Sequence, residues 1–262
     1  MTAVELVRAP NPGPLTGPGT NSYVITSRGE AIVLDPGPVI DEHIAAIRVA
    51  LTGLTPVGVV VTHTHPDHAP AANGLGIELD VPVLGFDRGP DFEPTGRLED
   101  GSPIRVGDDE LTALHTPGHT ADHLCFRLGD ALFTGDHIVG GSTVIIEDAA
   151  AYMASLHKVA DLEPAHLYPG HGPELPEART VIAGYIAHRL ERERQVLAAL
   201  RSGADSIDAI VDVVYRGLDP ALRTAAVFQV HTQLMKLKSE GWVVLSGGGA
   251  QGTTTVRFVE RV

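Results

Sequence analysis

Residues 59–68 read Val-Val-Val-Thr-His-Thr-His-Pro-Asp-His, an apolar run that leads directly into four potential metal ligands. The three β-branched residues predict a buried strand over residues 57–61, with the polar residues in the loop that follows it. His63 and His65 are two positions apart, so both side chains point to the same side while the chain stays extended. The two imidazoles are therefore placed to hold one metal ion together.

Asp67 and His68 follow the same strand after Pro66 has turned the chain. A helix that starts at this proline and runs to about Leu75 would direct both side chains toward a second ion beside the first. The alternatives are a histidine-rich surface loop and a single structural zinc site. A structural zinc site usually has four protein ligands that often include cysteine, whereas Cys125 is the only cysteine of the sequence. We therefore predict a centre for two metal ions.

The composition is that of an ordinary soluble globular protein, with 43% hydrophobic and 20% charged residues. The 262 residues suffice for one large domain or for a large and a small one. No run approaches the roughly 18 apolar residues of a membrane span, and residues 1–19 contain no apolar signal segment. The single cysteine excludes an internal disulfide framework. We expect a cytoplasmic protein without a membrane partner, and the sequence does not indicate its oligomeric state.

The net charge of −14 is unevenly distributed along the chain. Residues 1–190 contain 10 Lys and Arg against 25 Asp and Glu, whereas residues 191–262 contain 9 against 8. An acidic body disfavours broad electrostatic attraction of nucleic acid. Any contact with nucleic acid would need the metal ions or the C-terminal segment.

Short strands alternate with helices up to about residue 176. The pattern predicts strands over residues 22–26, 31–34, 57–61, 110–115, 123–128, 131–134 and 166–168. It predicts helices over residues 41–51 and 149–162. Residues 9–21 are too rich in proline and glycine for a regular element. His119, Asp136 and His171 each lie just past a predicted strand end, in turns of the kind that often carry function.

The residues after Pro176 follow a different pattern. Helices are predicted over residues 180–201, 206–215 and 219–240, and β-like segments over residues 242–245 and 254–259. The β-like segments flank the glycine-rich residues 246–252. Three helices followed by a hairpin are typical of a winged helix. We predict a catalytic domain over residues 1–190 and a winged-helix-like domain over residues 191–262.

The chain resembles the metallo-β-lactamase superfamily at seven ligand positions. Residues 63–68 match the His-x-His-x-Asp-His motif of the family, and His119, Asp136 and His171 match its three later single-ligand motifs in the right order. The resemblance covers about residues 15–175. It implies an α+β fold, an αββα sandwich of two sheets flanked by helices, with the metal ions at one edge. It also implies a metal-dependent hydrolase.

The family's ligands can be carried over to this sequence position by position. They imply one ion held by His63, His65 and His119, a second held by Asp67, His68 and His171, and Asp136 bridging both. Two divalent cations can share a water and lower its pKa to near 7, so that a bridging hydroxide attacks a carbonyl carbon or a phosphorus. Asp67 could also orient this hydroxide. These ligands accept zinc, manganese or iron, and zinc is our first expectation.

Within the superfamily the chain is similar to the branch of β-lactamase-like protein 2. The matching segments are Asn11-Pro12-Gly13, Thr20-Asn21-Ser22-Tyr23, His119-Thr120-x-Asp122-His123 and Tyr185-Ile186-x-His188-Arg189. The winged C-terminus matches as well. Members of this branch include an endoribonuclease that acts on single-stranded RNA and fungal thioesterases that release polyketides from a carrier protein. The branch therefore leaves the substrate open.

Four further residues near these motifs have more than one interpretation. His123 could donate a proton to a leaving group or support the ligands from behind. His137 follows Asp136 where a smaller, less basic residue is usual in the family, and we expect it to support that aspartate. His188 and Arg189 could point into the cleft and bind a phosphate or a carboxylate, or they could lie on a solvated helix face.

Phosphodiester cleavage of single-stranded RNA is our first functional interpretation. The branch supports it, as do four basic residues of the winged segment, Arg223, Lys236, Lys238 and Arg257. The second is a thioesterase or small-ester hydrolase resembling glyoxalase II. A β-lactamase is less expected, because the common zinc β-lactamases carry a cysteine at the position of Asp136. A DNA-binding regulator is also less expected, because winged helices that read DNA have a more basic recognition helix.

Overall fold

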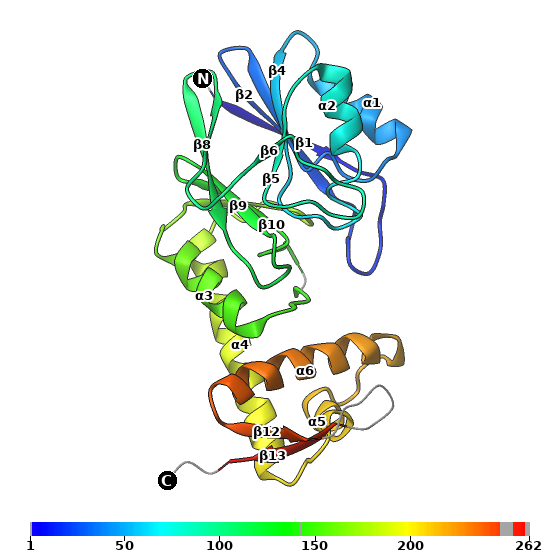
Figure 1. Cartoon of the computed structure of the whole chain (residues 1–262), viewed down its shortest axis with the longest axis vertical. Helices are drawn as coiled ribbons and strands as arrows, with labels where there is room; N and C mark the ends of the chain where they lie inside the picture. The colour runs from blue at the N-terminus through cyan, green and yellow to red at the C-terminus, as the bar shows by residue number, and fades with distance from the viewer. Residues whose placement is uncertain (1, 142, 247–253, 260–262) are drawn as a thin grey trace.

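The computed structural model describes residues 2–141, 143–246 and 254–259. The sheets and the helices that cover them form the upper part of the molecule in Figure 1, and a group of helices with a hairpin forms the lower part. None of the described helices has the length and apolar composition that a bilayer-spanning helix needs. The cytoplasmic location stays a prediction.

Within the described residues, the first sheet has the strand order β1-β2-β3-β4-β5-β6. Its strands are β1 (Ala3–Arg8), β2 (Asn21–Ser27), β3 (Glu30–Leu34), β4 (Thr55–Val60), β5 (Val83–Gly85) and β6 (Gly96–Arg97). The pairs β1–β2 and β2–β3 are antiparallel, and the pairs from β3 to β6 are parallel. Parallel neighbours need a crossover. Helices α1 (Asp41–Ala50) and α2 (Ala72–Leu79) supply the crossovers from β3 to β4 and from β4 to β5.

The second sheet has the order β11-β10-β9-β8-β7 over the same described residues. Its strands are β7 (Pro103–Val106), β8 (Asp109–His115), β9 (Leu124–Leu128), β10 (Ala131–Gly135) and β11 (His166–Pro169). Only the β10–β11 pair of this sheet is parallel, and helix α3 (Ala149–Ala160) makes that crossover.

Alternating side chains in the strands produce the layers. In β3, Ile32 and Leu34 face the second sheet, where they pack in one core with Phe126 of β9. Ala31 and Val33 of the same strand face the opposite side and pack in the core beneath α1 and α2. A third core lies between the second sheet and helices α3 and α4 (Ala178–Arg201). The expected αββα sandwich is confirmed.

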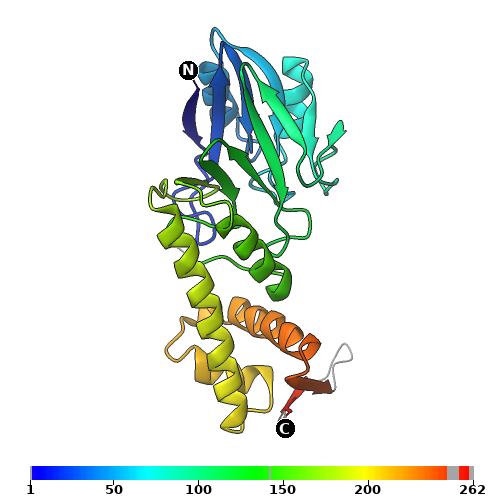
Figure 2. The same cartoon turned by 90° about the vertical axis from the view of Figure 1, so that its left-hand side faces the viewer.

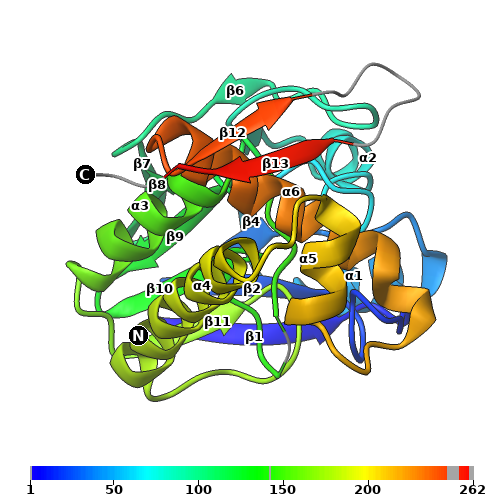
Figure 3. The same cartoon turned by 90° about the horizontal axis from the view of Figure 1, so that it is seen from below.

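The C-terminal part is built on the far end of α4, which runs down from the sandwich in Figure 2. Its elements are α5 (Ile207–Val214), the short 3₁₀ helix η1 (Pro220–Leu222), α6 (Arg223–Ser239), β12 (Val243–Ser246) and β13 (Thr255–Phe258). The β12–β13 hairpin lies beside α6 in Figure 3, and both elements share one apolar core with the end of α4. The expected winged helix is confirmed, and residues 247–253 of its glycine-rich loop lie outside the described residues.

The proposed domain division between residues 190 and 191 falls within α4. Ile182 of this helix packs in the core beneath α3, whereas Val196 and Leu200 pack in the C-terminal core. One continuous helix therefore belongs to both parts, and the division into residues 1–190 and 191–262 stays a prediction.

One local expectation was wrong, and one strand was not predicted. Pro66 does not start a helix, because residues 66–70 form turns and α2 begins only at Ala72. A second proline at position 70 explains the delay, since it disfavours helical backbone at the residue before it. Strand β1 was not expected from the sequence at all. It is an edge strand whose side chains are mostly exposed, so the alternation that would have revealed it is weak.

Candidate metal centre

The seven expected ligands converge at one edge of the sandwich. They come from the loops that follow β4, β8, β10 and β11, namely His63, His65, Asp67 and His68, then His119, Asp136 and His171. The turn before Asp136 depends on Gly135, whose φ of 47° lies in the left-handed region. A Cβ at this glycine would lie 2.9 Å from the Thr62 side chain, so another residue would displace the loop.

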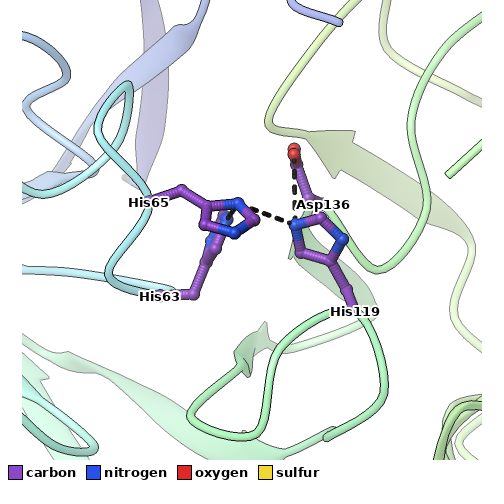
Figure 4. Close-up of side chains that lie close together, drawn as sticks. All are labelled: His63, His65, His119 and Asp136. Atoms are coloured by element: carbon purple, nitrogen blue, oxygen red, sulfur yellow. Dashed lines mark hydrogen bonds and ion pairs between the residues drawn. The ribbon is translucent and has the colours of Figure 1, made fainter. Parts of the chain in front are cut away.

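The first ligand set comprises His63, His65, His119 and Asp136, whose ligand atoms all lie within 4.8 Å of one another. His65 Nδ1 is 3.0 Å from His63 Nε2 and 3.0 Å from His119 Nε2. His119 Nε2 is 3.6 Å from Asp136 Oδ2. Figure 4 shows these side chains pointing toward one another, with His63 and His65 on one loop and His119 and Asp136 on two others. Ligand atoms that surround one zinc ion, each about 2.0–2.2 Å from it, lie roughly 3–4 Å from one another. The distances in the first set are of this size.

The second ligand set comprises Asp67, His68 and His171. His171 Nε2 is 3.1 Å from Asp67 Oδ2 and 3.3 Å from His68 Nε2. Asp136 joins the two sets. Its Oδ1 is 3.3 Å from His171 Nε2 and 3.5 Å from His68 Nε2, while its Oδ2 faces the first set.

Three of the histidines direct Nε2 into the site because their Nδ1 atoms are held from outside. The acceptors of Nδ1 are Asp35 Oδ2 for His68 at 2.9 Å, the Ile145 carbonyl for His119 at 2.6 Å and the Gly19 carbonyl for His171 at 3.3 Å. A carboxylate or carbonyl oxygen accepts a hydrogen bond only from a nitrogen that carries a proton. These contacts therefore place the proton on Nδ1 and leave the lone pair on Nε2. Metal-binding histidines are commonly oriented in this way.

Asp35 is a supporting residue that the sequence analysis missed. Its carboxylate accepts from the Thr62 backbone N–H at 2.7 Å, from Thr62 Oγ1 at 2.7 Å and from His68 Nδ1. Thr62 Oγ1 in turn lies 3.0 Å from His63 Nδ1, so one carboxylate supports a histidine of each set. Asp35 directly follows β3, and its place in the sequence says nothing of its partners.

Thr20 and Asn21, where the N-terminal loop leads into β2, supply three more hydrogen bonds that the sequence did not reveal. Thr20 Oγ1 donates to Asp67 Oδ2 at 3.2 Å. Asn21 Nδ2 donates to the Pro169 and Gly172 carbonyls, each at 2.9 Å. These bonds fix the loop that carries His171. The Thr-Asn pair was noticed only as part of a family motif.

The two sets differ in electrostatics. Burial lowers the pKa of His63 well below its ordinary value, and neighbouring imidazoles add to this effect. Burial also disfavours charge on His171, but the nearby carboxylates of Asp136 and Asp67 outweigh it and raise its pKa to about 9. Burial would raise the pKa of Asp67, yet His68 and His171 lower it to about 2. The carboxylates therefore create a strongly cation-attracting site.

The residues fit a metal centre. Asp136 Oδ1 is buried and has no hydrogen-bond partner among the described residues. A buried carboxylate oxygen in that state is costly unless a cation compensates it. Imidazole nitrogens and carboxylate oxygens are ligands that suit zinc, manganese and iron. The cluster can thus bind metal, while the number and identity of the ions, and the role of each ligand, remain predictions.

His123 is fully buried behind the ligands. Its Nε2 accepts from the Asp136 backbone N–H at 3.2 Å, so Nδ1 carries the proton, and that nitrogen lies 3.0 Å from Thr116 Oγ1. Burial lowers its pKa well below the ordinary value. A neutral imidazole with both nitrogens engaged is poorly suited to the proton donation that the sequence suggested. These contacts favour positioning of Asp136.

The other uncertain residues lie outside the ligand sets. His137 is fully buried, and neither of its ring nitrogens has a hydrogen-bond partner in the described part of the chain. No contact therefore supports the expected bracing of Asp136. His188 is exposed on α4. Arg189 is buried, so it does not lie on the solvated helix face that the sequence allowed, and its Nη2 donates to the Val144 carbonyl at 2.6 Å.

A pocket of about 390 Å³ opens beside His65. Its walls include the charged residues Asp87, Arg88, Asp91, Asp122 and Glu147. Asp122 also accepts from the Thr64 backbone N–H at 2.9 Å, which secures the ligand loop. The pocket next to the ligands thus carries four carboxylates and one guanidinium.

Comparison with family models places the chain clearly. Residues 15–171 match the model of the Metallo-beta-lactamase superfamily, and residues 206–250 match that of the Beta-lactamase associated winged helix domain. A Beta-lactamase-like protein 2 homolog of Caenorhabditis elegans is 35% identical over 254 residues, covering 92% of this chain and 86% of the relative. An Atrochrysone carboxyl ACP thioesterase of Aspergillus chevalieri is 36% identical over 203 residues, covering 76% and 66%.

Solved structures share the fold over nearly the whole chain. A Beta-lactamase domain protein from Burkholderia ambifaria superimposes with a TM-score of 0.84 at 22% identity, over 98% of this chain and 91% of that one. A metallo-beta-lactamase family protein from Thermus thermophilus gives a TM-score of 0.78 at 23% identity, over 97% and 98%. The chain belongs to the metallo-β-lactamase superfamily, with its associated winged helix domain, and is a metal-dependent hydrolase.

Proposed function

We propose that the protein hydrolyses a thioester or small carboxylic ester at a centre of two divalent metal ions, with zinc as the first candidate. The observation that carries this proposal is the charge of the pocket beside His65, which has four carboxylates and one guanidinium. The negatively charged phosphodiester backbone of RNA would be repelled there, whereas an uncharged acyl group would not. Cleavage of single-stranded RNA, our first interpretation from sequence, therefore becomes the second.

Two of the four basic residues that favoured RNA, Arg223 and Lys236, form ion pairs with carboxylates of the protein. Arg223 forms ion pairs with Asp208 at 2.8 Å and with Asp212 at 2.7 Å. Lys236 pairs with Glu193 at 2.5 Å and with Glu240 at 2.7 Å. Their charges are neutralised within the C-terminal part. This also weakens the interpretation as a DNA-binding regulator.

The relatives add support of a different kind. The Aspergillus chevalieri relative is named as a thioesterase that acts on an acyl carrier protein. A thioester and a small ester share a carbonyl carbon as the reacting centre. The same ligand arrangement can therefore serve both, and the choice of acyl group depends on the pocket.

The chain's own residues supply the orientation that this reaction needs. His63, His65, His119 and Asp136 would hold one ion, and Asp67, His68, His171 and Asp136 the other. When bound, divalent ions supply Lewis acidity and acidify a water molecule. Thr20 Oγ1 fixes one oxygen of Asp67, which lets that carboxylate hold a proton donor in a defined direction. Asp35 fixes the imidazole of His68 from behind.

Two substrate classes tested on one enzyme preparation distinguish the proposals. The zinc-loaded protein would be assayed on acyl thioesters of N-acetylcysteamine, with thiol release as the readout, and on a labelled single-stranded RNA. Asp136→Ala serves as the inactive control for both. We expect thiol release that the variant and a chelator abolish. RNA cleavage that Asp136→Ala abolishes, with the thioesters left intact, would overturn the proposal in favour of the nuclease.

A further inference from the structure

The orientation of the proposed ligand His119 is set by one backbone carbonyl. Its Nδ1 donates to the Ile145 carbonyl at 2.6 Å. This bond fixes the proton on Nδ1 and leaves Nε2 for the ion, facing His65 Nδ1 at 3.0 Å. Whatever fixes the Ile145 carbonyl therefore also fixes the direction of the imidazole.

The carbonyls on either side of Ile145 are held by the two C-terminal helices. The Val144 carbonyl accepts from Arg189 Nη2 of α4 at 2.6 Å. The Ile146 carbonyl accepts from Gln229 Nε2 of α6 at 3.1 Å. Arg189 Nη1 also lies 3.3 Å from Gln229 Oε1 and donates to it. Three successive carbonyls thus bind α4, the ligand and α6 in turn.

Arg189 is buried and has few partners, so its guanidinium is held in one position. The side chain is only 6% exposed, and its guanidinium lies over the Tyr152 ring at 4.8 Å from the centroid. No carboxylate among the described residues forms an ion pair with it. A buried cation of this kind depends on the partners it has. Those partners are the Val144 carbonyl, the Gln229 amide and the aromatic ring.

We infer that Arg189 and Gln229 are positioning residues for His119. They hold residues 144–146 from both sides and so direct the imidazole toward the first ligand set. The inference rests on the proposed role of His119 as a metal ligand. It gives the winged-helix part a function within the metal centre, because Gln229 belongs to α6.

Substitutions at Gln229 test this inference through metal binding, which does not depend on the substrate. Gln229→Met keeps the side-chain volume and removes both hydrogen bonds. Gln229→Glu keeps an acceptor for Arg189 but cannot donate to the Ile146 carbonyl. Gln233→Met is the matched control, since it removes a buried amide one turn further along α6. The readouts are the visible spectrum of the Co²⁺-loaded protein and the Co²⁺ affinity measured by chelator competition.

We expect Gln229→Met and Gln229→Glu to weaken the binding of one Co²⁺ ion and to change its spectrum, while Gln233→Met matches the wild type. The loss should be about tenfold at most, because direct outer-shell partners of a ligand are worth roughly 10–100-fold. His119→Ala should lose that same ion altogether. Thermal unfolding of each variant confirms that the comparison is made on folded protein.

Two results would overturn the inference and can be told apart. Wild-type spectra and affinities in both Gln229 variants, with one ion lost in His119→Ala, would show that α6 does not position the ligand although the metal centre stands. Two ions bound at wild-type affinity in His119→Ala would remove the proposed ligand role itself. Neither result depends on whether thioesters or RNA are cleaved.

Discussion

The two ligand sets use the same residue types in opposite electrostatic surroundings. Burial lowers the pKa of His63 and of His119 in the first set, so these imidazoles are neutral ligands. In the second set, burial also disfavours charge on His68, but Asp136, Asp35 and Asp67 outweigh it and raise its pKa well above the ordinary value. One set offers neutral nitrogen, and the other concentrates negative charge.

This difference predicts that the two sets, which share Asp136, prefer different metal ions. Neutral imidazoles favour zinc, whereas a site richer in carboxylate accepts harder divalent cations such as manganese as well. The shared carboxylate, with one oxygen toward each set, is the feature that makes the sets a single centre. Substitution of the shared Asp136 should therefore lower activity and metal content more than substitution of a residue that belongs to one set alone.

Asp136→Ala should have the largest effect of any single substitution. It removes the one carboxylate that reaches both sets, and leaves His68 with Asp35 and His171 with Asp67 as their nearest carboxylates. We expect hydrolysis to fall by at least about a thousandfold, roughly 4 kcal/mol in the barrier, with loss of at least one bound ion. Metal analysis and thiol release on the same sample would measure both. Retention of two ions and of near wild-type activity would show that Asp136 does not link the sets.

His65→Ala and Asp67→Ala should separate the sets. Each should lower the metal content by about one ion, and His65→Ala should remove the tighter zinc equivalent because it belongs to the nitrogen-rich set. Activity should fall by about a hundredfold in each, less than for the shared ligand. Titration calorimetry with Zn²⁺ and then with Mn²⁺ would assign the ions. Loss of the same ion in both variants would contradict the two-set description.

Asp35→Asn should lower the metal affinity of both sets, but by different amounts. The carboxylate bonds His68 directly but reaches His63 only through Thr62. We expect a loss of about 10–100-fold in affinity at the second set and a smaller loss at the first. Chelator competition would measure it, with Asp109→Asn as a control because that aspartate bonds Ser27 at 2.6 Å, outside the centre. An equal loss in the two sets would mean that Asp35 acts only through overall stability.

His123→Gln should have the smallest effect. The glutamine oxygen can replace Nε2 as the acceptor for the Asp136 backbone N–H. A positioning role therefore predicts a loss of less than about tenfold with an unchanged pH profile, whereas general acid catalysis contributes about 10²–10⁴-fold. The pH dependence of kcat/KM would be compared for the wild type and the variant. A hundredfold loss together with a missing alkaline limb would restore His123 as the proton donor.

The main elements and the ligand cluster could be predicted because local patterns determine them. Apolar β-branched runs mark the strands, and the His-x-His-x-Asp-His spacing of residues 63–68 marks the loop at the strand end. His119, Asp136 and His171 were recognised by their order and by the turn residues around them. In the second sheet β8, β10 and β11 run in the same direction, because β9 is antiparallel to both β8 and β10, so the loops after these three strands lie at one edge.

The contacts that orient the ligands could not be predicted, because they join residues distant in sequence. Asp35 reaches His68 only after β3 and β4 pair in parallel, and Gln229 reaches Ile146 only after α6 packs beside the sandwich. Arg189 resembled a substrate-binding residue because its environment was unknown. In the folded chain it lies against Tyr152 and a backbone carbonyl.

We propose that the protein hydrolyses a thioester and that this requires two ions, one in each of the ligand sets that Asp136 joins. The most direct test is to remove metal from the protein, add Zn²⁺ stepwise and measure thiol release from an acyl thioester at each step. We predict that activity rises to a plateau at two equivalents and that Asp136→Ala stays inactive throughout. A plateau at one equivalent would contradict the requirement for metal in both ligand sets. Intact thioester at two equivalents, with RNA cut instead, would contradict the proposed thioester substrate.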